Sequence, residues 1–176
     1  MAALLLVLPS CGKGVGENAK IFQMGERVSL GPITYVVLSA EWKTTLGEGL
    51  EARMPANRFL LLHVTITNGS GAEVNVPLTQ LVDAKGGEHG ELQDGKGIQS
   101  WLGLLRRVSS TQTDDGYIAF DVPMGPLKLK VSDVGDLENE RVAMIEIPVR
   151  LEADANGTTN APLTTMPTVP VNPNSR

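Results

Sequence analysis

The pattern of apolar and polar residues along the chain is typical of short β-strands, and it is clearest over residues 59–69. Leu60, Leu62, Val64 and Ile66 occupy alternate positions, and the run stops at an Asn-Gly-Ser-Gly sequence that favours a turn. Because successive side chains of a strand point to opposite faces, these four share one face. We therefore predict a central strand that covers a core on one side only.

The same alternation returns in several later stretches. Residues 33–43, 117–123, 127–131 and 142–151 each alternate apolar and polar positions, and Gly, Pro, Asn and Asp separate them. Parallel sheets require long helical crossovers, which the sequence does not indicate. The pattern therefore predicts an all-β fold, an antiparallel immunoglobulin-like β-sandwich, and Pro148 indicates that its last strand lies at an edge.

One stretch, residues 98–105, has a different period. Ile98, Trp101, Leu102 and Leu105 recur at the spacing of one helical face, which predicts a short helical insertion at an opening of the sandwich. If these side chains are exposed, they form a contact patch for a partner protein, an envelope lipid or a small apolar ligand. If they are buried, they close the end of the core. We name these four residues as candidate ligand or partner contacts.

Composition and length define the domain organisation. The chain has 176 residues, enough for one domain, and a formal net charge of -5 without a basic stripe, which excludes nucleic acid as an expected partner. We expect a signal peptide over residues 1–10, a flexible tether over 11–24 and the sandwich over 25–151. Residues 152–176 are rich in Thr, Asn and Pro and hold no aromatic residue, so we expect a disordered tail.

The single cysteine, Cys11, is informative because of its position. It excludes an internal disulfide, and it follows an apolar run that is too short to span a bilayer. Leu8, Ser10 and Cys11 resemble the lipobox of bacterial lipoproteins, which implies a lipid on Cys11, a membrane anchor and an extracytoplasmic place at the bacterial cell envelope. No Lys or Arg precedes the run, so we expect the natural start to lie upstream. The other interpretation is a lone buried cysteine.

Four stretches in order carry a wider resemblance: residues 25–28, 59–68, 81–86 and 117–123. Together they resemble the bacterial immunoglobulin-like domains of unknown function, of the DUF4352 type, which are found mainly on lipoproteins and secreted proteins. The shape of these domains is similar to that of a mycobacterial secreted immunogenic antigen. The resemblance implies a β-sandwich, an envelope location and no catalytic residues.

Few residues in the chain are candidates for a metal site or a catalytic site. His63 and His89, with nearby carboxylates, are weak candidates for a metal site, but their spacing matches no known ligand pattern and a solvated surface is the preferred interpretation. Two histidines leave little room for a catalytic triad, so we expect no enzyme and no cofactor. We predict a non-catalytic, lipid-anchored envelope protein that acts as a binding or accessory module, with an envelope protein as a possible partner. The alternatives are a metal-binding envelope protein and a sandwich-type protease inhibitor that uses the loop at residues 44–57.

Overall fold

The described part of the chain is built almost entirely of strands. The computed structural model describes residues 19–133 and 140–149, and within them eleven strands and one short 3-10 helix, η1 (Gly49–Glu51). The first sheet runs in the order β1 (Lys20–Gln23), β11 (Val142–Ile147), β10 (Leu127–Ser132), β6 (Gln80–Asp83) and β7 (Glu88–Gly90). The second runs β2 (Val28–Leu30), β3 (Ile33–Lys43), β4 (Arg58–Asn68) and β9 (Thr113–Val122). A third pairs β5 (Val74–Val76) with β8 (Arg106–Val108).

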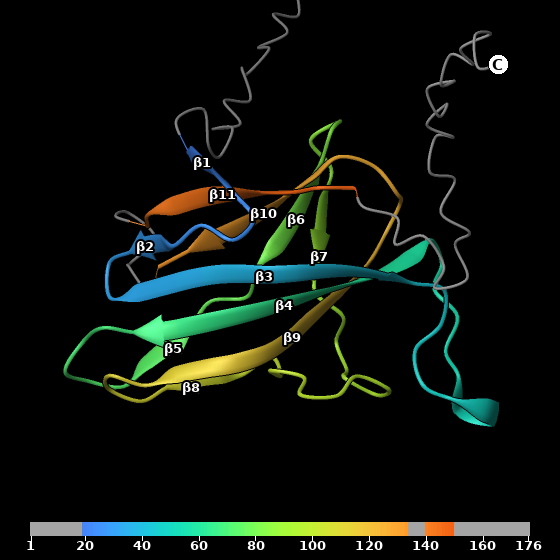
Figure 1. Cartoon of the computed structure of the whole chain (residues 1–176), viewed down its shortest axis with the longest axis horizontal. Helices are drawn as coiled ribbons and strands as arrows, with labels where there is room; N and C mark the ends of the chain where they lie inside the picture. The colour runs from blue at the N-terminus through green and yellow to red at the C-terminus, as the bar shows by residue number, and fades with distance from the viewer. Residues whose placement is uncertain (1–18, 134–139, 150–176) are drawn as a thin grey trace, which may run out of the picture.

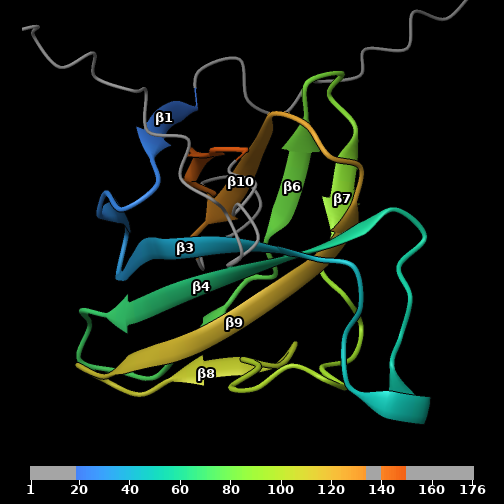
Figure 2. The same ribbon diagram turned by 45° about the vertical axis from the view of Figure 1, so that its right-hand side comes forward.

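The two larger sheets form the layers of a β-sandwich, as predicted from the alternation (Figures 1 and 2). Among the strand pairs of the described ranges, only β1 and β11 run parallel, and the others are antiparallel. This parallel pair places β1 at an edge and β11 inside the five-stranded sheet. The expectation that Pro148 marks an edge strand is therefore wrong, because that proline follows the end of β11 and removes no ladder hydrogen bond from it.

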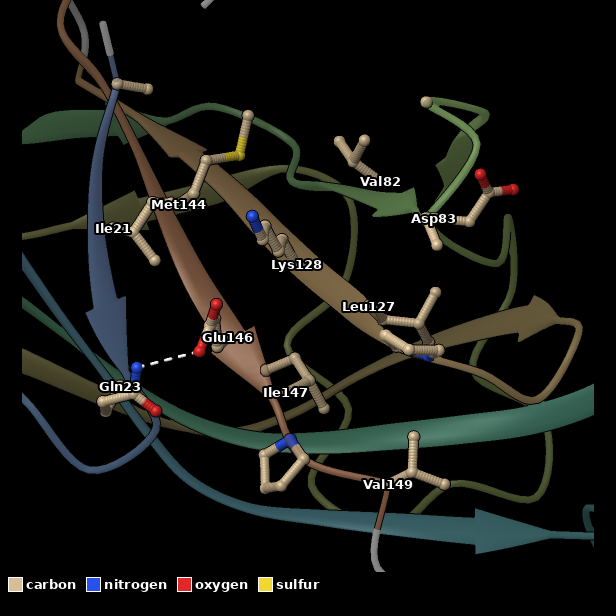
Figure 3. A pocket seen from close by; sticks show the side chains of 15 residues that line it. Ile21, Gln23, Val82, Asp83, Leu127, Lys128, Met144, Glu146, Ile147 and Val149 are labelled. Carbon is tan, nitrogen blue, oxygen red and sulfur yellow. Dashed lines mark hydrogen bonds between the residues drawn. The ribbon is translucent and has the colours of Figure 1, made fainter.

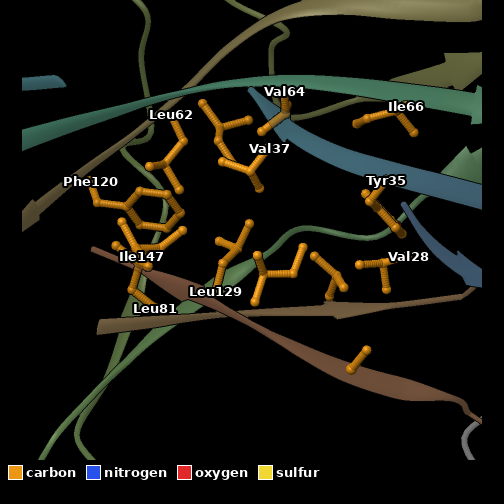
Figure 4. Packing of buried hydrophobic residues seen from close by; sticks show 14 of the residues in the cluster. Val28, Tyr35, Val37, Leu62, Val64, Ile66, Leu81, Phe120, Leu129 and Ile147 are labelled. Carbon is orange, nitrogen blue, oxygen red and sulfur yellow. The ribbon is translucent and has the colours of Figure 1, made fainter. Parts of the chain in front are cut away.

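The core lies between the two layers, where alternate residues of facing strands meet (Figure 4). Leu62 and Val64 of β4 and Phe120 of β9 are buried against Leu129 of β10. Tyr35 of β3 adds a polar connection, because its hydroxyl donates a hydrogen bond of 2.7 Å to the backbone oxygen of Ser132 on β10. Burial raises the pKa of the Tyr35 hydroxyl, so this link between the sheets stays protonated.

Strand β4 is buried on both faces over its first half, which differs from the one-sided strand predicted. Phe59 and Leu61 point away from the main core into a second apolar cluster with Leu46 and Ala119. The chain around Leu46 covers this face, because Leu46 and Arg53 form an antiparallel bridge at the base of the loop that carries η1. Only the second half of the strand alternates buried with half-buried residues.

Residues 98–105 do not form the predicted helix. They form turns and one parallel bridge between Trp101 and Tyr117 at the free edge of β9. The backbone N–H of Leu102 donates to the oxygen of Tyr117 at 3.0 Å, and that of Tyr117 donates to Ser100 at 2.9 Å. Ser100 and Gly103 take positive φ angles of 50° and 72°, which a helix does not allow. Edge pairing with β9 therefore replaces the helical hydrogen bonds.

Three short strands lie where the sequence indicated none. Strand β1 begins at Lys20, within the stretch expected to be tether, so the sandwich starts before the predicted boundary at residue 25. Strand β7 lies in the hydrophilic loop after β6 and pairs with β6 as a hairpin. Strand β8 begins at Arg106, directly after the stretch predicted to be helical. Each has only three or four residues, too few for its alternation to be recognised.

Candidate functional site

A groove of about 770 Å³ lies on the outer face of the five-stranded sheet (Figure 3). Its lining comes from the outward side chains of β1, β11, β10 and β6 and from the chain just beyond β11. Most of the lining is apolar, with Ile21, Val82, Met144 and Val149 among the labelled side chains in Figure 3. Such a volume is within the range of about 300–1,000 Å³ that small-molecule sites usually have.

Strand register explains why these side chains gather. Gln23 lies opposite Glu146, Glu146 opposite Lys128, and Lys128 opposite Val82, so the four form one row across four neighbouring strands. Cross-strand neighbours on one face stand about 4.5–5.5 Å apart, which brings their side chains into contact range. The groove is therefore a product of the pairing order and not of any local sequence motif.

Both carboxylates of the groove accept hydrogen bonds. The Oε2 atom of Glu146 accepts one of 2.9 Å from the side-chain amide of Gln23, which draws the carboxylate toward β1 (Figure 3). Asp83 accepts hydrogen bonds from the backbone N–H groups of Lys85 and Gly87 at 2.8 and 2.9 Å, and its Oδ2 lies 3.0 Å from His89 Nε2. The hydrogen bond with His89, followed by those from Gly87 and Lys85, lowers the pKa of Asp83 to about 2.

Unlike the two carboxylates, the amine of Lys128 in the groove has no hydrogen-bond partner among the described residues. No hydrogen bond or ion pair joins its amine to any residue within the described ranges, although it is half-buried. Lys130, two positions further along the same strand and on the same face, contacts Glu88 Oε1 at 3.1 Å and Gln80 Oε1 at 3.2 Å. The groove therefore holds one amine without a hydrogen-bond or ion-pair partner among the described residues, on a mostly apolar surface and with Glu146 on the neighbouring strand.

A second hollow of about 350 Å³ lies on the outer face of the other sheet. Glu41, Lys43 and Tyr117 line it, and the Tyr117 hydroxyl donates to Glu41 Oε1 at 3.4 Å. Desolvation and the charge of Glu41 raise the pKa of Tyr117. Lys43 lies 3.3 Å from the other oxygen of Glu41, so the charges of these two side chains compensate each other.

The four predicted contact residues do not form one patch. Ile98 packs against the second apolar cluster and Leu102 against the main core. Trp101 is half-buried, with its ring against the backbone of Gly95, whereas Leu105 is 95% exposed. Ile98, Trp101 and Leu102 are therefore partly buried, in different surroundings, and of the four residues only Leu105 is strongly exposed.

The two histidines lie in different sheets. His63 Nε2 is 3.0 Å from Asp115 Oδ1, and its ring stacks on Tyr117 with centroids 4.8 Å apart. His89 is engaged with Asp83 at the rim of the groove. Among the residues that the structure describes, no three His, Cys, Asp or Glu side chains are grouped as metal ligands.

A buried ion pair that the sequence did not indicate lies in the interior. Glu91 and Arg106 form a bidentate ion pair, and each side chain is only 1% exposed. The backbone N–H and the hydroxyl of Thr79 also donate to Glu91 Oε1, at 2.7 and 2.8 Å. Arg106 Nε donates to the oxygen of Gly103 at 2.8 Å, so the pair holds together three segments distant in sequence. Opposite charges separated by fifteen positions give no local signal of such a contact.

Cys11 lies outside the described residues. No helix within residues 19–133 and 140–149 has the length and apolar character needed to cross a membrane.

Comparison with protein families gives one match, to the family described as a domain of unknown function (DUF4352), over residues 22–137. The chain belongs to this family. The matched range begins within β1, includes β6 and β10 of the groove and ends before β11. The resemblance predicted from the four stretches of sequence is thereby confirmed.

Several solved structures share the fold at low sequence identity. YjhA of Bacillus subtilis has 13% identity and a TM-score of 0.55, covering 72% of this chain and 99% of its own. YcdA, a candidate lipoprotein of the same species, has 13% identity and a TM-score of 0.52, covering 69% of this chain and 38% of its own. MPT63, a secreted protein of Mycobacterium tuberculosis, has 15% identity and a TM-score of 0.50, covering 75% and 98%. Comparison with curated proteins finds no match.

Proposed function

We propose that the protein is a non-catalytic, lipid-anchored binding module of the bacterial cell envelope, and that the groove on the five-stranded sheet is its binding surface. The observation that carries the proposal is the groove itself, an open and mostly apolar hollow in which the Lys128 amine has no hydrogen bond or ion pair with a described residue. Sites of this kind, mostly apolar with a few polar groups, are the usual binding places of small ligands.

Two observations support the lipid anchor: the sequence around Cys11 and the short length of chain between Cys11 and the groove. Cys11 follows a lipobox-like sequence and lies eight positions before Ala19, which lines the groove. An extended chain of that length spans at most about 28 Å, so a lipid on Cys11 would hold the groove close to the membrane surface. The likeness in fold to a candidate lipoprotein and to a secreted protein agrees with an extracytoplasmic place.

The alternative functions receive less support from the geometry. A metal-binding role would need His63 and His89 in one site, and they lie in different sheets. A protease inhibitor presents an extended segment to its target, whereas the loop at residues 44–57 is turned at its tip into η1 and is fixed at its base by the Leu46–Arg53 bridge. Leu50 at that tip is fully exposed, which makes the loop accessible but not substrate-like.

Membrane fractionation and intact mass test the proposal. The wild-type chain and Cys11→Ala are expressed in a bacterial host, with Ser10→Ala as a control that keeps a small residue before the cysteine. We expect wild type and the control in the membrane fraction, with a mass that shows loss of the first ten residues and gain of lipid. We expect Cys11→Ala without lipid. If wild type and Cys11→Ala both keep the first ten residues, carry no lipid and partition alike, the lipid anchor is contradicted.

A further inference from the structure

We propose that the groove takes a single-chain anionic amphiphile of the fatty-acid class, with its carboxylate at the Lys128 amine and its alkyl chain along the apolar lining. This inference rests on the proposed function of the groove as a binding surface and names the ligand of that surface. It follows from the contrast between the polar groups that line the groove.

Of the charged groups in the groove, the Lys128 amine is the one left without a hydrogen-bond partner among the described residues, and it can bind an anion. Glu146 is held by Gln23, and Asp83 is held by His89 and two backbone N–H groups, so both carboxylates have donors already. Lys128 has no acceptor within the described residues, and in Figure 3 its amine extends toward Met144 and away from the Glu146 carboxylate. A half-buried ammonium on an apolar surface gains most from an anionic group that brings its own apolar chain.

The shape and lining of the groove select for an alkyl chain. Ile21 and Val149 are 49% and 44% exposed, and Val82 and Met144 extend the same surface between them. The lining side chains come from four neighbouring strands, β1, β11, β10 and β6, and this wide apolar surface suits a flexible chain better than a compact polar solute (Figure 3). Each methylene removed from water strengthens binding by about fourfold.

Isothermal titration with three defined probes of equal chain length separates the contributions. Dodecanoate, dodecyltrimethylammonium and dodecyl maltoside are titrated below their critical micelle concentrations into the full chain carrying Cys11→Ala, which removes any acyl chain on the protein itself. We expect dodecanoate to bind most tightly and the ammonium amphiphile most weakly. We also expect tetradecanoate to bind more tightly than dodecanoate.

Matched variants assign the binding to Lys128. Lys128→Gln is expected to weaken dodecanoate about tenfold while leaving dodecyl maltoside unchanged, because only the charge-assisted contact is lost. Lys130→Gln, on the same strand and face but outside the lining, is the control and is expected to bind as wild type. Lys128→Glu is expected to reverse the preference toward the ammonium amphiphile, and Glu146→Gln to tighten dodecanoate by removing a nearby negative charge. Thermal unfolding checks that each variant is folded.

The outcomes distinguish this inference from the proposed function. If the three probes bind alike and Lys128→Gln changes nothing, the ligand class is wrong while the groove remains a binding surface. If no probe binds, both the ligand class and this use of the groove are wrong, and the fractionation result still decides the anchor separately. If sedimentation shows a dimer that Met144→Glu dissociates, a second copy occupies the groove and the inference is overturned.

Discussion

Arg106 and Glu91 form a buried ion pair in the interior, where each charge must be compensated by a partner. Both side chains are almost fully buried, so each charge depends on the other and on Thr79 for compensation. A buried ion pair adds little net stability compared with apolar residues of similar volume, but removing one partner leaves an uncompensated charge. The pair therefore fixes how β8 and the segments before β6 and after β7 come together.

Replacing Arg106 with Met is expected to lower the free energy of unfolding by about 3–5 kcal/mol, because Glu91 is left buried without its partner. Arg107→Met, at the exposed neighbouring position, is the control and is expected to change it by less than about 0.5 kcal/mol. Urea unfolding measures both. A loss of less than about 1 kcal/mol for Arg106→Met would mean that water or another group compensates Glu91.

Asn68 is buried and fixes the turn that ends β4. Its side-chain amide donates to the backbone oxygens of Ala72 at 2.7 Å and Val108 at 3.0 Å. Asn68→Ala is expected to cost about 2–3 kcal/mol in the free energy of unfolding, because the buried carbonyl of Val108 and the partly buried hydrogen bond to Ala72 lose their donor. Asn75→Ala, at an exposed position of β5, is the matched control. Equal midpoints for both variants in urea would contradict this role.

Asp83 gives a pH-dependent signal at the rim of the groove. Its pKa is lowered from 3.8 to about 2, first by the hydrogen bond with His89 and then by those from Gly87 and Lys85. The stabilising contribution is therefore complete above pH 3.8 and is lost as the pH falls through 2. Carboxyl NMR titration is expected to give a midpoint near 2, and His89→Ala should raise it toward 3.8. A wild-type midpoint at 3.8 would show that the turn is not formed.

At the scale of elements, the free edge of β9 is covered by residues 100–102. Gly116 of β9 makes this possible, because a Cβ atom there would lie 2.3 Å from the backbone oxygen of Ser100. Covering an edge in this way satisfies its backbone groups and protects it from pairing with other chains. The segment that we expected to be helical therefore serves as an irregular edge of the sheet.

Gly116→Ala is expected to displace residues 100–102 from β9 and to lower the free energy of unfolding by about 1–3 kcal/mol through overpacking. Gly125→Ala is the control, since nothing lies within 4 Å of a Cβ at that position. Hydrogen exchange followed by mass spectrometry should show faster exchange at residues 98–105 in Gly116→Ala alone. Unchanged exchange there would mean that the segment does not depend on this contact.

Long strands were predictable from the sequence, and short or edge elements were not. Strand β3 has the predicted bounds of 33–43, and β4 differs from its predicted bounds by one residue at each end, because each is eleven residues long and alternates over about half of that length. Strands β7 and β8 have three residues each and depend on partners distant in sequence. The apolar spacing of residues 98–105 fits a helix, but Gly97 and Gly103, both at positive φ, permit turns that place Ile98 and Leu102 in separate clusters.

At the scale of the whole molecule, the groove lies where the described chain begins and ends. Ala19 and Val149 both line it, so the segment that leads to Cys11 enters beside it. None of its lining residues was predicted as a site, because the row of Gln23, Glu146, Lys128 and Val82 arises from strand order. The predicted contact residues instead stabilise the opposite sheet, and only Leu105 among them remains exposed.

Mapping of backbone amide shifts by NMR with dodecanoate tests most directly whether the groove is the binding surface. We expect saturable shifts on β1, β10 and β11, at residues such as Ile21, Lys128 and Met144, with little change around the second hollow near Glu41 and Tyr117. Shifts centred on Glu41 and Tyr117, or no saturable shifts on the five-stranded sheet, would contradict it.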